Sequence, residues 1–121
     1  MQVERRRFKR YVVNENGFEV FSRQLKIQGK LKDISQKGLS YQYTPFNREQ
    51  SLSEVIDILG TSPERMYIQG LVCKRIYDIV VLSEARGFRG IKTRLRGLEF
   101  DGLTEKQKKK VMCLIGGYET G

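Results

Sequence analysis

The alternation of apolar and polar residues predicts a domain built mainly from short β-strands. From Leu25 to Lys32, apolar residues and one glycine occupy every second position, and lysines and glutamines fill the positions between them. This period of two is typical of a strand with one buried face. A second alternating run covers residues 39–44, and the stretch from Asp33 to Gly38 between the runs is rich in turn formers. The two runs are therefore expected to form an antiparallel pair.

Four more segments have the length and composition of strands, namely 17–23, 53–59, 66–76 and 92–100. In the last segment the apolar phase becomes clear only at Leu98 and Phe100, and Gly97 is interpreted as a bulge or a bend. Residues 79–89 are compatible with both a strand and a turn. The loops carry Gly, Pro, Asn and Ser, a pattern that predicts an antiparallel barrel or sandwich.

One helix is expected at the C-terminal end, over residues 104–116. Thr104 and Gln107 have the spacing of a capping box, and the pair Gly116-Gly117 is expected to end the helix. An apolar stripe, expected to lie against the barrel, recurs at helical spacing through Val111, Leu114, Ile115 and Tyr118.

The length of 121 residues fits a single domain, divided into an arm over 1–12, a barrel over 17–101 and the helix. The absence of histidine excludes His-dependent catalysis and His-containing zinc sites. Cys73 and Cys113 are too far apart in sequence for a CxxC pair, and both are expected to be small buried residues in a reducing cytosol. No apolar stretch is long enough for a membrane span, and the N-terminus lacks a signal-peptide core. A soluble cytoplasmic protein without a metal site, a cofactor or catalytic residues is expected.

The formal net charge of +9 predicts an anionic partner. Residues 4–10 carry five positive charges and one negative charge, and residues 104–110 carry four lysines and one glutamate. The excess charge is therefore concentrated at the two ends, whereas a nucleic-acid-binding domain usually spreads it along one face.

Two local motifs give this charge a candidate partner. Arg6 and Arg10 form an RxxxR spacing, which occurs by chance about once in a chain this rich in arginine. Asp33, Ser35 and Gly38 form a DxSxxG motif, which is far rarer by chance and carries the greater weight. Arginine binds phosphates and the guanine O6/N7 edge, aspartate accepts hydrogen bonds from guanine N1 and N2, and serine binds phosphate or base. The glycine is expected to give the loop a positive φ.

At these residues the sequence resembles the PilZ family of cyclic di-GMP receptors. The resemblance extends over residues 4–118, from the RxxxR arm through the DxSxxG loop to a late strand containing Gly97-Leu98-Glu99-Phe100 and the C-terminal helix. It implies a mainly β fold of the split-barrel type, a six-stranded antiparallel β-barrel with a basic N-terminal arm and one C-terminal α-helix.

The resemblance also implies a ligand site. Arg6 and Arg10 match the arginines that hold the guanine and phosphate groups, and Asp33, Ser35 and Gly38 match the second motif, with Asp33 on a guanine edge. Arg5 precedes the first arginine, at a position associated in the family with binding an intercalated ligand pair rather than one molecule. The ligand site is thus expected to comprise Arg6, Arg10, Asp33, Ser35 and Gly38, with Arg5 as a further candidate.

The functional hypothesis is a non-enzymatic bacterial receptor in second-messenger signal transduction. Cyclic di-GMP would draw the mobile arm onto the barrel, and an effector protein would read the changed surface in the control of motility, pili, exopolysaccharide or biofilm. The alternative is a small basic β-barrel that binds single-stranded nucleic acid and stacks bases on Tyr41, Tyr43, Tyr67 and Tyr77. An adaptor that binds only proteins is the third hypothesis.

Overall fold

The computed structural model describes residues 9–13, 17–45, 52–60, 66–81 and 93–119, and side chains within the helix as far as Gly116. These residues form seven strands and one helix. The elements are β1 (Tyr11–Val12), β2 (Phe18–Ser22), β3 (Ile27–Ile34), β4 (Gly38–Tyr43), β5 (Ser53–Gly60), β6 (Tyr67–Val81), β7 (Thr93–Phe100) and α1 (Glu105–Glu119).

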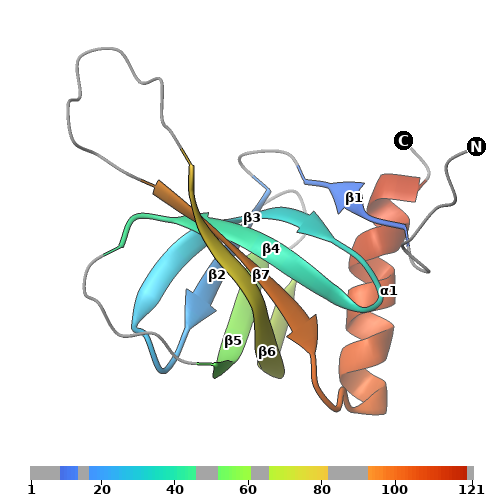
Figure 1. Cartoon of the computed structure of the whole chain (residues 1–121). Helices are drawn as coiled ribbons and strands as arrows, with labels where there is room; N and C mark the ends of the chain where they lie inside the picture. The colour runs from blue at the N-terminus through green and yellow to red at the C-terminus, as the bar shows by residue number, and fades with distance from the viewer. Residues whose placement is uncertain (1–8, 14–16, 46–51, 61–65, 82–92, 120–121) are drawn as a thin grey trace, which may run out of the picture.

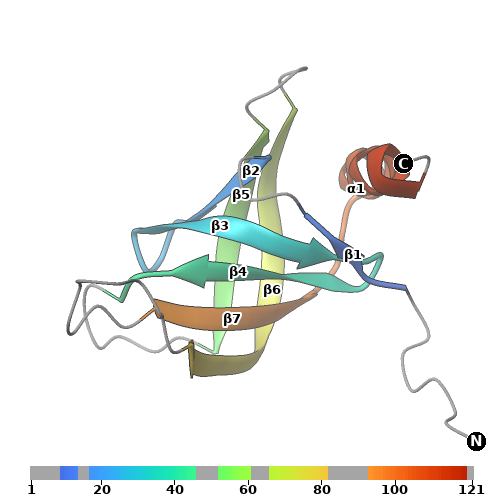
Figure 2. The same cartoon turned by 90° about the horizontal axis from the view of Figure 1, so that it is seen from above.

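Six of the strands close into an antiparallel barrel. Neighbours follow the order β3-β2-β5-β6-β7-β4, and the pairing of β4 with β3 closes the ring. The short strand β1 is added outside this ring, on β3. Helix α1 stands beside the barrel, next to β1 and the β3–β4 turn (Figures 1 and 2). The expected six-stranded barrel with one C-terminal helix is confirmed.

Alternating side chains from all six barrel strands fill the core. Along β5, and along β3 as far as Leu31, every second residue is buried, as the period of two requires. Val111, Leu114 and Ile115 of α1 are buried in the same cluster, which confirms the apolar stripe for these residues; the Tyr118 side chain lies outside the described residues. Burial of each such large apolar side chain contributes about 1.5–3 kcal/mol, so the helix is an integral part of the core.

The start of α1 is fixed by the expected capping box. The Thr104 backbone N–H donates to Gln107 Oε1 (3.0 Å), and the Gln107 N–H donates to Thr104 Oγ1 (3.1 Å). Gln107 Nε2 also donates to the carbonyl oxygens of Gln69 and Gly70 on β6. This one side chain therefore caps the helix and anchors it to the barrel.

Several expected boundaries were wrong. Strand β3 begins at Ile27, because Leu25 belongs to a turn in which Lys26 adopts a φ of 52°. Helix α1 continues through Gly116-Gly117 to Glu119, since Gly116 does not take the left-handed conformation of a glycine C-cap. Residues 79–81 of the ambiguous segment belong to β6, and residues 82–89 lie outside the described residues. Cys73 is buried as expected, whereas Cys113 is exposed on α1, off the apolar stripe.

The irregularity expected at Gly97 lies on the partner strand. The register of β6 against β7 shifts between Arg75 and Tyr77, opposite Gly97 and Leu98. A Cβ on Gly97 would stand 2.2 Å from the ring of Tyr77, so glycine is required because this aromatic ring packs directly on the backbone.

The end of the expected arm is ordered on the barrel. Tyr11 and Val12 form β1 and pair with Ile34 and Asp33 of β3, and Val13 is buried in the core. Residues 1–8 of the arm lie outside the described residues. Among the described residues, no helix has the length and apolar character that crossing a membrane requires.

Candidate functional site

The DxSxxG motif forms the turn between β3 and β4. Asp33 lies near the end of β3, Ser35 begins the turn, and Gly38 is the first residue of β4. The Ser35 backbone N–H donates to the Gly38 carbonyl oxygen at 2.8 Å and closes the turn. The sequence motif is therefore one compact structural unit.

Ser35 holds this turn together from inside. Its side-chain oxygen accepts hydrogen bonds from the backbone N–H groups of Lys37 (3.1 Å) and Gly38 (3.3 Å), and the residue is buried. A serine hydroxyl that binds N–H groups two and three residues ahead is the usual way in which serine stabilises a turn. Ser35 is thus placed to shape the turn, and direct contact of its hydroxyl with a ligand stays a prediction.

Gly38 is required for a reason other than the expected one. Its φ is not positive, but a Cβ at this position would lie 2.0 Å from the carbonyl oxygen of Leu98 on β7. The Lys37 carbonyl oxygen also accepts a hydrogen bond from the Phe100 N–H at 2.8 Å. Glycine therefore allows the turn to pack against the end of β7, with no clash between backbones.

Arg10 and Asp33 are brought together by the pairing of β1 with β3. Arg10 Nη1 lies 3.7 Å from Asp33 Oδ2, and both side chains are partly exposed. The register of β3 against β4 shifts between Leu31 and Asp33, and such a bulge changes the direction of the side chains next to it. The structure thus unites one residue from each motif, although the two lie 23 positions apart in the sequence.

The second carboxylate oxygen of Asp33 differs from the first in its hydrogen bonding. Asp33 Oδ1 is buried and has no hydrogen-bond partner among the described residues. A buried carboxylate oxygen without a donor costs about 1–3 kcal/mol or more, because it has lost its water and gained nothing in exchange. The Asp33 carboxylate is partly exposed as a whole, and it holds an acceptor oxygen whose donor the described residues do not supply. Arg5 and Arg6 lie outside the described residues.

Two solved structures share this arrangement of strands. The chain superposes on the PilZ domain of YcgR from Escherichia coli, solved with c-di-GMP, with a TM-score of 0.74 and 14% identity, over 97% of this chain and 93% of that one. The fold of this chain is that of a PilZ domain.

A second PilZ-fold structure is the Borreliella burgdorferi PlzA protein in complex with c-di-GMP. It matches with a TM-score of 0.61 and 16% identity over 91% of this chain, which spans 51% of PlzA. No protein-family model and no curated protein sequence matches the chain. The likeness therefore lies in the fold, which confirms the architecture implied by the sequence motifs.

Sequence reasoning missed one residue beside the site of this PilZ fold. Ser40 on β4 pairs with Asp33, and its buried hydroxyl also has no hydrogen-bond partner among the described residues. The alternation along β4 gave a usable signal, since Ser40 lies between the core residues Leu39 and Tyr41 and must point to the outside of the barrel.

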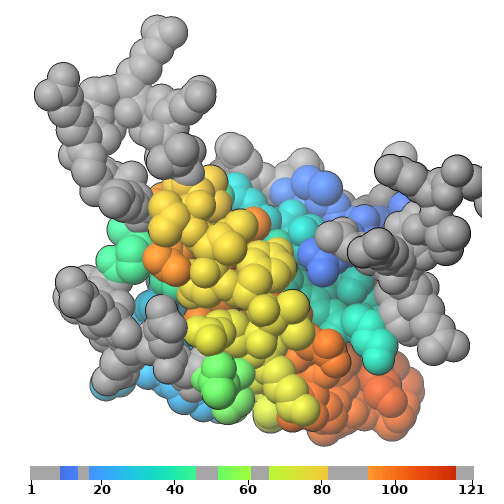
Figure 3. Space-filling model, in the orientation of Figure 1, coloured from blue at the N-terminus to red at the C-terminus, as the bar shows by residue number. Residues whose placement is uncertain are grey.

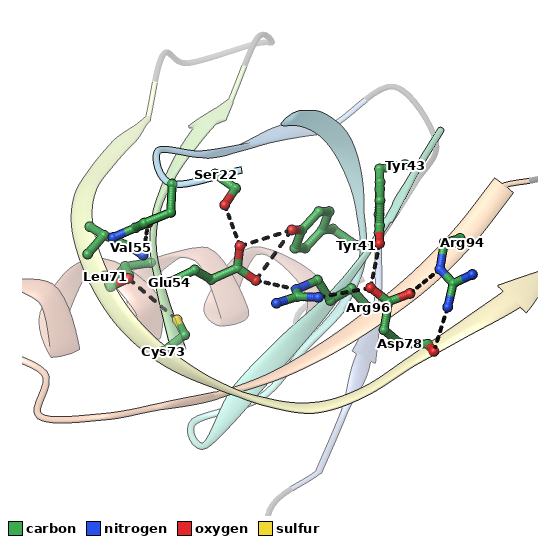
Figure 4. A network of polar contacts seen from close by, with 11 residues as sticks. Ser22, Tyr41, Tyr43, Glu54, Val55, Leu71, Cys73, Asp78, Arg94 and Arg96 are labelled. Atoms are coloured by element: carbon green, nitrogen blue, oxygen red, sulfur yellow. Dashed lines mark hydrogen bonds and ion pairs between the residues drawn. The ribbon is translucent and has the colours of Figure 1, made fainter. Parts of the chain in front are cut away.

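A second polar cluster lies inside the PilZ barrel (Figure 4). Arg96 on β7 is 1% exposed and bridges two acids: its Nε lies 2.5 Å from Glu54 Oε1, and its Nη1 lies 2.9 Å from Asp78 Oδ2. Four more side chains complete the cluster through hydrogen bonds or ion pairs to these acids, namely Ser22, Tyr41, Tyr43 and Arg94. Every acid in it has partners on several strands.

The partners in this cluster determine its ionisation. Burial alone would raise the pKa of Asp78, but hydrogen bonds from Tyr43, Arg94 and Arg96 outweigh burial and lower it. Burial and the bond to Asp78 raise the pKa of Tyr43 to about 12, and burial raises that of Tyr41. The tyrosines therefore stay neutral donors and Asp78 stays ionised at neutral pH, as a structural ion network requires.

The tyrosines proposed as base-stacking platforms are placed differently. Tyr41 and Tyr43 are buried in the barrel, so this part of the nucleic-acid hypothesis was wrong. Tyr67 is exposed on β6, and Tyr77 packs on Gly97. In the part of the chain that the structure describes, no group of three or more Cys, Asp or Glu side chains is arranged to hold a metal ion.

Proposed function

We propose that the protein is a non-enzymatic receptor for cyclic di-GMP in the bacterial cytoplasm. The ligand is bound where the N-terminal arm meets the β3–β4 turn, by Arg6, Arg10 and Asp33. The observation that carries this proposal is the partly exposed Arg10–Asp33 pair, in which a buried oxygen of Asp33 has no partner among the described residues. It is supported by two structures with the same fold, both of which contain c-di-GMP.

The chemistry of the two residues matches the ligand. Guanine presents N1–H and N2–H donors on one edge, and the two oxygens of a carboxylate accept one hydrogen bond each. Arg10 offers a planar set of donors to a phosphate or to guanine O6 and N7. At 3.7 Å, the ion pair between Arg10 Nη1 and Asp33 Oδ2 is loose enough to be exchanged for contacts with a ligand. Ser35 and Gly38 keep the turn in the shape that presents Asp33.

The signalling step follows from the position of Arg10. Because Arg10 directly precedes β1, a ligand that binds Arg6 and Arg10 fixes the arm ahead of this strand against the barrel. The changed surface is then read by an effector protein that controls motility, pili, exopolysaccharide or biofilm.

Isothermal titration calorimetry at about 150 mM salt tests the proposal. Cyclic di-GMP should bind with micromolar or tighter affinity, whereas cyclic di-AMP and GMP should bind much more weakly. The ligand-to-protein ratio in the wild type and in Arg5→Leu tests whether Arg5 supports a ligand pair. Heat from a single-stranded oligonucleotide but none from cyclic di-GMP would overturn the proposal in favour of nucleic-acid binding, which falls steeply as salt rises.

A further inference from the structure

A groove lies between the β3–β4 turn, the end of β7 and helix α1. It has a volume of about 570 Å³, and its apolar surface comes from Phe100, Leu103, Val111 and Met112. Gln36 and Lys37 border it on the side of the turn, and Lys108 borders it on the side of α1. In the space-filling view the teal surface of the turn meets the orange surface of the helix on this face (Figure 3).

The chemistry of the groove is apolar inside and cationic at the rim. Met112 is 43% exposed, so its side chain gives the groove apolar surface that a partner can cover. Lys37 and Lys108 lie on its two sides, and none of the described residues that line it is acidic. Glu105 lies 3.4 Å from the Lys108 ammonium, but both side chains are largely exposed, and such pairs exchange readily.

We propose that this groove docks an acidic, amphipathic segment of a partner protein. Apolar side chains of the segment contact Met112 and Phe100, and its carboxylates contact Lys37 and Lys108. Charge complementarity favours this acidic segment over the two other candidate occupants, which are the chain's own arm and a second copy of the chain. The chain's own arm carries five positive charges in residues 4–10, and a second copy carries a formal +9, so the lysines repel both.

The groove shares its wall with the proposed ligand site. Gln36 and Lys37 belong to the turn held by Ser35, and the Lys37 carbonyl accepts the hydrogen bond from Phe100, whose side chain lines the groove. A ligand at Asp33 that stabilises one form of the turn therefore changes the affinity of the groove for its partner. This coupling rests on the proposed function, whereas the docking itself does not.

Fluorescence anisotropy with a labelled peptide in which leucine alternates with glutamate tests the docking. The full chain should bind it, and the same peptide with lysine in place of glutamate should not bind. Lys108→Glu should weaken binding at least about tenfold. Lys109→Glu, the matched control, makes the same charge change on an exposed residue of the same helix that does not line the groove, and should weaken binding less than about twofold. Equal losses in both variants, or no binding of the acidic peptide, would overturn the proposal.

Met112→Glu separates groove contact from general charge attraction, because it places a carboxylate on the exposed apolar surface. It should abolish acidic-peptide binding while the circular dichroism spectrum stays unchanged; retained binding by this folded variant would contradict docking in the groove.

The coupling is tested by repeating the peptide titration with saturating cyclic di-GMP. A change in peptide affinity of at least about fivefold is expected, and by thermodynamic linkage the peptide should change cyclic di-GMP affinity by the same factor. Direct calorimetry distinguishes the possible failures. If cyclic di-GMP does not bind but the peptide still discriminates Lys108→Glu from Lys109→Glu, the proposed function fails and the docking stands. If both bind without affecting each other, the coupling alone is wrong.

Discussion

Two arginine–carboxylate clusters in this protein differ in how many of their carboxylate oxygens have hydrogen-bond or ion-pair partners. Inside the barrel, Arg96 lies within 2.9 Å of oxygens on both Glu54 and Asp78, and tyrosine hydroxyls add further donors. At the β3–β4 turn, Arg10 lies 3.7 Å from one oxygen of Asp33, while the other oxygen has no partner among the described residues. The first cluster is closed and complete, and the second is partly exposed and incomplete.

This difference indicates different roles for chemically similar groups. Complete burial makes each member of the inner cluster depend on the others, because a charge left without its partner in the barrel is very costly. The outer cluster keeps a carboxylate oxygen whose hydrogen bond has to come from elsewhere. This difference supports a structural role for the inner cluster and the proposed binding role for the outer one, and substitutions can separate the two.

The largest effect is expected from breaking the inner cluster. Glu54→Ala leaves the guanidinium of Arg96 buried without one of its two acids, and loss of one partner from a buried pair costs about 3–5 kcal/mol. Urea unfolding followed by circular dichroism measures this loss. Glu99→Ala, on the exposed side of β7, is the control and should change the free energy of unfolding by less than about 0.5 kcal/mol. Similar stabilities for the two variants would refute the structural role.

A smaller effect, on binding rather than stability, is expected at the outer cluster. Asp33→Ala removes a charge-assisted contact worth about 1.5–3 kcal/mol and should weaken cyclic di-GMP binding at least about tenfold. Its free energy of unfolding should not fall, because the lost ion pair is long and partly exposed and the buried oxygen without a partner is removed with it. Asp101→Ala removes a comparably long pair with Lys74 at 3.9 Å and should leave calorimetric affinity for cyclic di-GMP intact.

Substitution of Gly38 tests whether the turn is held by close packing. Gly38→Ala places a Cβ against the Leu98 carbonyl and should destabilise the fold by about 1–3 kcal/mol, with weaker ligand binding because the turn must shift. Gly116→Ala is the matched control in open space within α1 and should stabilise the protein by up to about 1 kcal/mol in the same thermal and urea unfolding experiments. A neutral Gly38→Ala would show that the turn tolerates displacement.

The smallest effect is expected in the acid response of the inner cluster. Because the pKa of Asp78 is lower in the folded state than in the unfolded chain, its contribution to stability is present above its ordinary pKa of 3.8. That contribution should be lost as pH falls through the lower, folded-state pKa. Unfolding free energies measured from about pH 6 down to about pH 3 should fall less steeply for Asp78→Asn than for the wild type. If the free energy of unfolding fell equally steeply with pH in both proteins, Asp78 would not contribute to the acid response.

Most of the barrel could be predicted from the sequence, because alternation is strong where inward positions are apolar. The signal was weak in β7 for a physical reason: Arg96 occupies an inward position that apolar residues normally fill, so the phase became clear only at Leu98. Its acids come from β5 and β6, and no local pattern connects residues 42 and 18 positions apart. The strands that carry the inner cluster could therefore be predicted from the sequence, but the cluster itself could not.

The residues of the candidate site were predicted from its motifs, but the contacts that hold these residues in place were not. Asp33 and Arg10 do lie together, whereas the roles of Ser35 and Gly38 depend on hydrogen bonds within the turn and on the approach of β7. The isolated oxygen of Asp33 and the hydroxyl of Ser40 are visible only after three strands are placed side by side.

The most direct test of the contrast between the clusters is urea unfolding of the wild type and Asp33→Ala, each with and without saturating cyclic di-GMP. A ligand that binds only the folded state raises its stability in proportion to the logarithm of ligand concentration. We predict that Asp33→Ala is at least as stable as the wild type without ligand, and that cyclic di-GMP stabilises only the wild type. An Asp33→Ala protein that is strongly destabilised without ligand, yet stabilised by cyclic di-GMP as much as the wild type, would contradict the account.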